Sequence, residues 1–211
     1  MSASDQDDRP GPIVLGAVLC GGRSSRFGSD KALAPLGEST VGASVVDALR
    51  GAGVDPVVAI GGTAGSMLAI PTVPDLRPGD GPLAGLATAL LWARTGPVLV
   101  TPCDLPLLRA GHVRLILDAY RATVANPQTL DGDDMAVVAT VDGEPQLSLA
   151  VWPATRGRTL LRALDGGTRA FRAALDHGRW CGVEIPPEAV ADADTPEELT
   201  ELRRSAGVDE V

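Results

Sequence analysis

The stretch that decides the fold is Ile13-Val14-Leu15-Gly16-Ala17-Val18-Leu19, a continuous apolar run that ends abruptly at Cys20-Gly21-Gly22. A run of this length, closed by glycines, is typical of a strand that is buried on both faces of a parallel sheet. The glycines allow a tight turn at the carboxyl end of that strand. The stretch therefore predicts the first strand of an α/β fold.

The chain after this strand alternates between helix and strand patterns. Ser39-Thr40 can cap a helix from Val41 to about Arg50, and Pro82 lies in the first turn of a helix that runs to Ala93. Together with the strands, this order predicts a three-layer, doubly wound, mostly parallel sheet. The other expected helices span about 111–122, 154–164, 168–175 and 196–204, the last capped by Thr195. The other expected strands span 56–60, 70–74, 98–101, 135–141 and 147–152, of which the proline-bearing 70–74 lies near an edge and the last two form a hairpin.

Composition excludes several classes of protein. The chain has 211 residues, 45% of them apolar, and a net charge of −9. That charge argues against a nucleic-acid or membrane-surface binder, which needs a basic face. Three scattered cysteines favour a reducing compartment, and the acidic start lacks the apolar core of a signal peptide, so we expect a cytoplasmic protein. Residues 1–12 are expected to form a disordered extension, and 13–211 a single domain.

Basic residues gather in the glycine-rich loop of this acidic chain. Gly21 and Gly22 are followed by Arg23, Arg26 and Lys31. Backbone N–H groups in such a turn point at an anion, and the cations add charge-assisted contacts to phosphate. The spacing matches neither the P-loop nor the dinucleotide-binding pattern. An ordinary turn with solvated charges is the alternative, but the clustering favours a phosphate site.

Two aspartates follow predicted strands at the carboxyl edge of the sheet, where open α/β folds bind ligands. Asp104 comes after strand 98–101, and Asp75 comes after segment 70–74. Magnesium favours one or two carboxylates together with substrate phosphates, so Asp104 is a candidate ligand. An aspartate that only forms a turn between prolines is the alternative. Cys103 is interpreted as a packing residue, and His112 and His177, which have no predicted partner nearby, are given no role.

At these residues the chain resembles the molybdenum cofactor guanylyltransferases, the MobA-like nucleotidyltransferases. The loop is similar to their L-A-G-G-x-S-x-R-M-G-x-D-K-A-L signature. Three more motifs follow in the family's order and span most of the chain. They are Pro74-Asp75 with Gly79-Asp80-Gly81-Pro82-Leu83-Ala84-Gly85, then Pro102-Cys103-Asp104-Leu105-Pro106, and Asp194-Thr195-Pro196-Glu197-Glu198-Leu199.

The resemblance implies a Rossmann-like nucleotidyltransferase fold with a nucleotide-binding N-terminal half and an acceptor-binding C-terminal half. It also implies transfer of GMP from GTP, with Mg²⁺, to molybdopterin. Arg26 and Lys31 would neutralise the leaving pyrophosphate, and Asp104 would hold the metal. The implied nucleotide contacts are Leu19, Cys20, Gly21, Gly22, Lys31, Asp75 and Asp104. The implied partners are GTP, the molybdopterin acceptor and cofactor-delivery proteins.

The chain departs from the family pattern at several positions. In the loop, Cys20 stands where the family has alanine and Phe27 where it has methionine, and both are small changes of side chain. Gln146-Leu147-Ser148-Leu149 and Asp192-Ala193-Asp194 depart more, and both fall in the half expected to bind the pterin. The alternatives are therefore a nucleotidyltransferase with another base or acceptor, such as a cytidylyltransferase for the same cofactor or a sugar-1-phosphate nucleotidyltransferase, and a non-catalytic nucleotide-binding protein.

Overall fold

The computed structural model describes residues 13–21, 31–125, 134–193 and 195–205, and for Lys31, Pro196, Arg203 and Ser205 the backbone alone. Several predicted features lie outside these residues. They are the extension 1–12, the loop residues Gly22 and Arg26, nearly all of the loop at 126–134, and Asp194.

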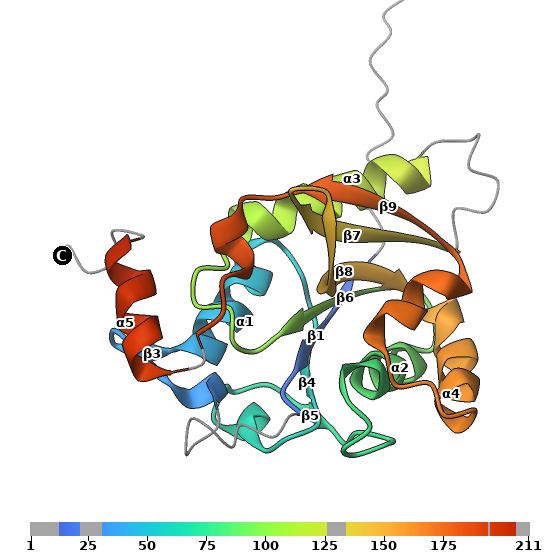
Figure 1. Cartoon of the computed structure of the whole chain (residues 1–211), viewed down its shortest axis with the longest axis horizontal. Coiled ribbons are helices and arrows are strands. Elements are labelled where there is room, and N and C mark those ends of the chain that lie inside the picture. Colours follow the sequence, from blue (N-terminus) through green and yellow to red (C-terminus); the bar gives the residue numbers. More distant parts are fainter. Residues whose placement is uncertain (1–12, 22–30, 126–133, 194, 206–211) are drawn as a thin grey trace, which may run out of the picture.

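A seven-stranded sheet forms the centre of the described structure, in the order β5-β4-β1-β6-β8-β7-β9 (Figure 1). β1 pairs in parallel with β4 on one side and with β6 on the other. Only β8 runs against its neighbours β6 and β7 in this sheet. The mostly parallel sheet is therefore confirmed. The strands are β1 Leu15–Leu19, β4 Val57–Ile60, β5 Thr72–Val73, β6 Pro97–Pro102, β7 Met135–Val141, β8 Glu144–Pro153 and β9 Arg179–Glu184.

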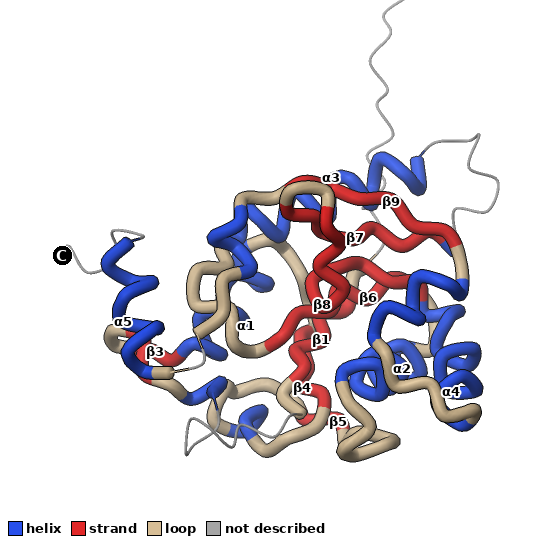
Figure 2. Tube along the Cα trace, in the orientation of Figure 1, coloured by secondary structure: helices blue, strands red, loops and turns tan. Residues whose placement is uncertain are grey.

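Helices cover both faces of the sheet, which confirms the three layers (Figure 2). One face packs against α1 and α3, and the other against α2 and α4. Successive strand residues alternate between the two cores, as the strand geometry requires: Leu99 belongs to the first, and Val98 and Val100 to the second. The helices are α1 Val41–Gly51, α2 Pro82–Ala93, α3 Ala110–Ala125, α4 Gly157–Asp165 and α5 Pro196–Ser205.

Local signals in the sequence account for the ends of the helices. The Thr40 hydroxyl accepts a hydrogen bond from the Ala43 N–H at 3.3 Å, so Thr40 caps α1. The Thr195 hydroxyl accepts from the Glu198 N–H at 3.2 Å at the start of α5. α2 begins at Pro82 and ends at Ala93, the predicted bounds. These three helix starts are confirmed.

Smaller elements complete the described fold. Asp142 and Gly143 both have positive φ, 52° and 79°, and form the two-residue turn between β7 and β8. The other short elements are the hairpin β2 Pro35–Leu36 with β3 Ser39–Thr40, and the 3-10 helices η1 Lys31–Leu33, η2 Ala64–Ser66, η4 Ala154–Arg156, η5 Phe171–His177 and η6 Pro187–Val190.

One strand of the seven-stranded sheet was not predicted, and one predicted helix was wrong. β9 pairs in parallel with β7 at the edge of the sheet. Its residues are half-buried or exposed and include Gly182, so they lack the apolar run that marks a buried strand. The expected helix 168–175 is a 3-10 helix from Phe171 to His177. Both segments adopt their conformations where they pack on the rest of the fold, which sequence periodicity does not report.

The last helix returns to the N-terminal half of the molecule. Ala193 and Leu199 form a small core with Ala34 and Val41, just after the glycine-rich loop. Segment 192–199 was expected in the half that binds the acceptor, and the fold brings it beside the chain that follows the loop. Within the described residues, no helix is both long and apolar enough to span a membrane. All three cysteines are free.

Candidate nucleotide-binding site

Four parallel strands end level with one another at one edge of the sheet. Leu19 at the end of β1 pairs with Ile60 at the end of β4 and with Pro102 at the end of β6. Ile60 pairs in turn with Val73 at the end of β5. β4 and β6 flank β1 on opposite sides, so the chain reverses its winding direction here. This reversal creates the crevice in which open α/β sheets bind ligands.

Of the predicted site residues that the structure describes, those around Cys20, Asp75 and Asp104 leave the sheet at this edge. They follow the level strand ends by one or two positions: Cys20-Gly21 after β1, Pro74-Asp75 after β5 and Cys103-Asp104 after β6. Leu19 is half-buried, Cys20 is buried and Gly21 is exposed. Asp75 and Asp104 are both half-buried. The backbone of Lys31 opens η1, on the far side of the loop.

Glycines after β4 allow two loops to approach one another. Gly61 and Gly62 have φ values of 67° and 63°. A Cβ on Gly61 would lie 3.3 Å from Gly21 Cα, and a Cβ on Gly62 would collide with the Cys20 carbonyl oxygen. The sequence analysis did not assign these glycines to the site, although a glycine pair directly after a buried strand is a usable signal. Their lack of side chains leaves the Gly21 backbone room to bind a ligand.

The carboxylate of Asp75 is held by donors on one of its oxygens. Oδ1 accepts hydrogen bonds from the Thr88 hydroxyl and from the Arg77 N–H, both at 3.0 Å. Oδ2 lies on the side of Gly21, 3.9 Å from the position that a Cβ on this glycine would take. Among the described residues, no hydrogen bond ends on Oδ2. One carboxylate oxygen is therefore left without a hydrogen bond from the described residues, beside the backbone of Gly21.

Asp75 and Asp104 follow strands that are three inter-strand steps apart, β5 and β6. At about 4.8 Å a step, these strand ends lie about 14 Å apart. The carboxylate of Asp75 reaches back past β4, because its Oδ2 lies beside Gly21 at the end of β1, the neighbour of β6. The segments that carry the two carboxylates therefore flank the loop after β1.

Helix α2 brings a helix N-terminus to the same edge. It connects the parallel strands β5 and β6, so it runs against them and begins at their carboxyl ends. Gly85 in its first turn packs on Leu19, because a Cβ there would lie 3.1 Å from Leu19 Cδ2. The unpaired N–H groups and the dipole of a helix N-terminus favour a nearby anion.

Two ion pairs fasten the loop between β5 and α2 to the end of α4. Arg77 Nη2 lies 2.6 Å from Asp165 Oδ1, and Arg169 Nη2 lies 3.1 Å from Asp80 Oδ2. The hydrogen bond and charge of Asp165 raise the pKa of the Arg77 guanidinium above its usual value. The loop that carries Asp75 is thus attached to both α2 and α4.

A family model fits this chain from residue 16 to residue 179, and its description is "MobA-like NTP transferase domain". The match covers β4, β5 and β6, all of β1 except Leu15, and the residues that follow these strands at the edge described above. The chain belongs to the MobA-like NTP transferase family.

Curated relatives of this nucleotidyltransferase carry names from the same family. The "Molybdenum cofactor guanylyltransferase" of Burkholderia vietnamiensis is 31% identical over 209 residues, which is 92% of this chain and 97% of that protein. The "Probable molybdenum cofactor guanylyltransferase" of Carboxydothermus hydrogenoformans is 40% identical over 102 residues. That second match spans about half of each protein, 48% of this chain and 52% of the relative.

Solved structures share the fold. Molybdopterin-guanine dinucleotide biosynthesis protein A from Archaeoglobus fulgidus superposes with a TM-score of 0.68 at 19% identity, over 92% of this chain and 99% of that one. Rv0371c from Mycobacterium tuberculosis, solved in complex with manganese, has a TM-score of 0.59 at 20% identity, over 92% and 99% of the two chains. These likenesses confirm the nucleotidyltransferase fold.

Beyond β6, the sheet of this nucleotidyltransferase opens at the same edge. Pairing of β6 with β8 ends at Val100 and Ala150, although β6 continues to Pro102. The pairing of β8 with β7 skips from Ala150 to Gln146, so residues 147–149 form a bulge. Figures 1 and 2 show β8 bending sharply midway. Bulges next to active sites re-aim side chains and end pairing, and here the last two residues of β6, which lead to Asp104, have no partner in β8.

One sequence expectation about histidine was wrong. His112 was given no partner, but its Nδ1 accepts a hydrogen bond from the Arg109 N–H at 3.3 Å. Burial lowers the pKa of His112 below its usual value, which favours the neutral ring that can accept this bond. The bond lies within one turn at the start of α3, so it has a local structural role.

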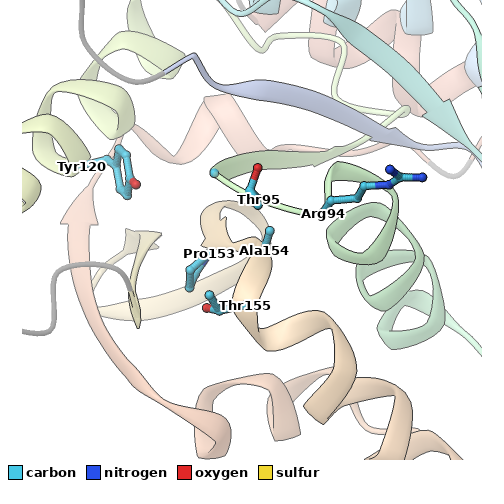
Figure 3. A pocket seen from close by; sticks show the side chains of 7 residues that line it. Arg94, Thr95, Tyr120, Pro153, Ala154 and Thr155 are labelled. Atoms are coloured by element: carbon cyan, nitrogen blue, oxygen red, sulfur yellow. The ribbon is translucent and has the colours of Figure 1, made fainter.

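A pocket of about 270 Å³ lies at the other end of the sheet (Figure 3). Pro97, the first residue of β6, pairs with Pro153, the last residue of the antiparallel β8, at that end. None of the predicted site residues lines this pocket, so it is separate from the candidate nucleotide site. Its lining residues are Arg94, Thr95, Gly96, Tyr120, Pro153, Ala154 and Thr155.

Proposed function

We propose that this nucleotidyltransferase transfers GMP from GTP to molybdopterin, forming the guanine dinucleotide cofactor and releasing pyrophosphate. The observation that carries the proposal is the level edge at which the loop after β1, Asp75 and Asp104 leave neighbouring parallel strands. This edge offers backbone N–H groups and carboxylates along an extended crevice, which suits a nucleoside triphosphate. The full-length relative named as a guanylyltransferase supports the choice of guanine.

The reaction is an in-line transfer at the α-phosphate. An oxygen of the terminal phosphate of molybdopterin forms a bond to the α-phosphorus, and the bond from that phosphorus to the bridging oxygen of the β-phosphate breaks. Pyrophosphate leaves with the electron pair. Such a reaction needs orientation and charge neutralisation rather than a covalent nucleophile on the protein.

Different residues along this edge contact different parts of GTP. Leu19, Cys20, Gly21 and Gly22 line the guanine and ribose, and Asp75 binds the nucleoside. Arg26 and Lys31 bind the triphosphate, where their charges offset the charge that grows on the leaving pyrophosphate. Asp104, beside β6, orients the α-phosphate from the opposite side of the loop.

Nucleotidyltransferases generally use a divalent metal, and a structure with this fold was solved with manganese. For this chain we propose Mg²⁺, held by Asp104 together with the phosphates of GTP. The donor set fits, because Mg²⁺ favours oxygen ligands and commonly takes one or two carboxylates with substrate phosphates. When bound, the metal supplies Lewis-acid stabilisation of phosphate charge.

The acceptor enters from the open side of the sheet. The bulge at 147–149 leaves the end of β6 unpaired on that side, next to the residues that lead to Asp104. Gln146, Leu147 and Ser148 are half-buried there. An acceptor phosphate in this space would reach the metal side of the α-phosphate. We further propose a cytoplasmic location, where GTP and cofactor-delivery proteins are available as partners.

The decisive experiment incubates the protein with molybdopterin, Mg²⁺ and GTP, CTP or ATP in turn, and identifies the product by mass spectrometry. We expect the guanine dinucleotide with release of pyrophosphate, and calorimetry should show tighter binding of GTP than of CTP or ATP. A cytosine dinucleotide product, or equal binding of CTP, would overturn the guanylyl assignment. Transfer to a sugar 1-phosphate instead of molybdopterin would overturn the acceptor.

A further inference from the structure

We propose that Thr88 is the positioning residue that aims the free oxygen of Asp75 at a hydrogen-bond donor of the bound nucleoside. This inference rests on the proposed function, because it assumes that a nucleotide occupies the edge beside Gly21. It adds a residue in the interior of α2 that the sequence motifs did not single out.

The hydroxyl of Thr88 makes two hydrogen bonds, both to the loop that carries Asp75. Thr88 lies in the middle of α2 and is 2% exposed. It donates its only proton to Asp75 Oδ1 at 3.0 Å and accepts from the Leu76 N–H at 3.1 Å. A threonine inside a helix often donates to the carbonyl four residues earlier instead. Both bonds here run to one loop, so the hydroxyl cannot rotate without losing one of them.

These bonds decide which oxygen of Asp75 is available. Oδ1 receives the Thr88 hydroxyl and the Arg77 N–H, whereas among the described residues no donor reaches Oδ2. Oδ2 lies on the side of the exposed Gly21 backbone. An ionised carboxylate only accepts hydrogen bonds, so Oδ2 selects a ligand group that donates one.

The position of Asp75 indicates the nucleoside end of the ligand. Its Oδ2 lies beside Gly21, which is proposed to line the guanine and ribose, whereas Asp104 and the proposed metal follow β6 on the other side of that loop. A carboxylate beside phosphates and without a cation would be repelled. The donors that remain are the ring N–H and amino group of guanine and the ribose hydroxyls, which share the same hydrogen-bond chemistry.

The test compares variants of Thr88 by steady-state kinetics with GTP. Thr88→Val keeps the shape and removes the hydroxyl, whereas Thr88→Ser keeps the hydroxyl. We expect Thr88→Val to raise KM for GTP about tenfold while kcat changes less than about twofold, because a misaligned hydrogen bond to a charged group weakens binding by about this factor. Thr88→Ser should restore KM to within about threefold of the wild-type value.

A matched control is Thr123→Val in α3. The Thr123 hydroxyl donates to the Ala119 carbonyl of its own helix at 2.9 Å, away from the nucleotide edge. This variant also replaces a helical threonine by valine and should leave KM unchanged. If Thr88→Val does not fold, Thr88→Cys replaces it, since the thiol is a weaker donor of similar size. KM for Thr88→Cys should then exceed that for Thr88→Ser.

Nucleotide analogues then identify the group that Oδ2 binds. ITP lacks the 2-amino group of GTP, and 2′-deoxy-GTP and 3′-deoxy-GTP each lack one ribose hydroxyl. The wild-type preference for GTP over one of these analogues should collapse in Thr88→Val, and that analogue names the donor. Unchanged preferences and an unchanged KM in Thr88→Val, with only a lower melting temperature, would show a merely structural role. A wild-type protein that binds no guanine nucleotide would overturn the proposed function itself.

Discussion

Leu19 on β1 pairs with Pro102 on β6 at the last position of both strands. The loop that starts at Cys20 and the segment that carries Asp104 therefore leave the sheet side by side. This single pairing brings the proposed phosphate loop next to the proposed metal ligand, although more than eighty positions separate them in the sequence.

Asp104→Asn should remove most of the activity and leave the fold intact. The amide keeps the size of the side chain but loses the charge that holds a metal ion, so pyrophosphate release should fall by at least about a hundredfold. The measurement is a coupled pyrophosphate assay at saturating GTP and Mg²⁺. Asp118→Asn, on the exposed surface of α3 where Asp118 pairs with Arg121, is the control. A fully active Asp104→Asn would remove Asp104 from the metal role.

Gly62→Ala should destabilise the protein more than Gly37→Ala. Both glycines have nearly the same φ, 63° and 62°, so the backbone strain is matched at about 1 kcal/mol. A Cβ on Gly62 collides with the Cys20 carbonyl, whereas a Cβ on Gly37 meets nothing within 4 Å. We expect urea unfolding to show an extra loss of about 1–3 kcal/mol for Gly62→Ala, together with weaker GTP binding. Equal losses in the two variants would contradict the close packing of the two loops.

Arg156→Leu and Asp134→Ala test a buried cation beneath β9. The side chain of Arg156 is 1% exposed, and its Nε donates to Asp134 Oδ1 at 3.0 Å. Its guanidinium also donates to the Arg179 carbonyl and lies 5.6 Å from the ring centre of Trp152. Removing the carboxylate leaves the charge without its partner, so Asp134→Ala should cost about 3 kcal/mol or more of unfolding free energy.

Replacing the buried cation by a similar apolar volume should cost less than removing its partner, because no charge remains buried. The measurement is urea unfolding of Arg156→Leu and Asp134→Ala side by side. A smaller loss for Asp134→Ala than for Arg156→Leu would mean that water or another residue compensates the charge. Arg156→Lys is a useful third variant, since lysine lacks the planar fork that reaches several acceptors.

Glu184→Gln should make the stability of the protein depend less on pH in the acid range. The Thr140 hydroxyl donates to Glu184 at 2.7 Å, and the backbone N–H groups of Asp142 and Gly143 donate to the same carboxylate. These bonds hold its pKa below the usual 4.5. A depressed pKa in the folded state gives stability that is present above the unfolded pKa and is lost as pH falls through the folded pKa.

The urea midpoint of the wild-type protein should therefore fall more steeply than that of Glu184→Gln as the pH drops below about 4.5. Glu144→Gln, at the start of β8 beside the turn that Glu184 binds, removes a charge without removing these hydrogen bonds and serves as the control. Parallel curves for the wild type and Glu184→Gln would show that these bonds do not favour the charged carboxylate.

The local elements of this protein could be predicted from the amino-acid sequence alone. The apolar run before Gly21, the cap at Thr40 and the proline at the start of α2 are short-range signals, and each predicted its strand or helix. These signals work because turns, caps and periodic faces depend on residues that are close in the chain. The motif order was also sufficient to indicate the family.

Which of these elements lie side by side depends on contacts that form only in the folded chain. The level ends of β1, β4, β5 and β6, the bulge in β8 and the return of α5 depend on pairing and packing between distant segments. No residue of β9 is fully buried, so β9 lacks the apolar face of a core strand. It forms because its backbone pairs in parallel with β7. The same holds for Thr88, whose hydroxyl meets Asp75 across a loop. Hydrogen bonds of this kind carry no periodicity in the sequence, so they emerge only when the chain is folded.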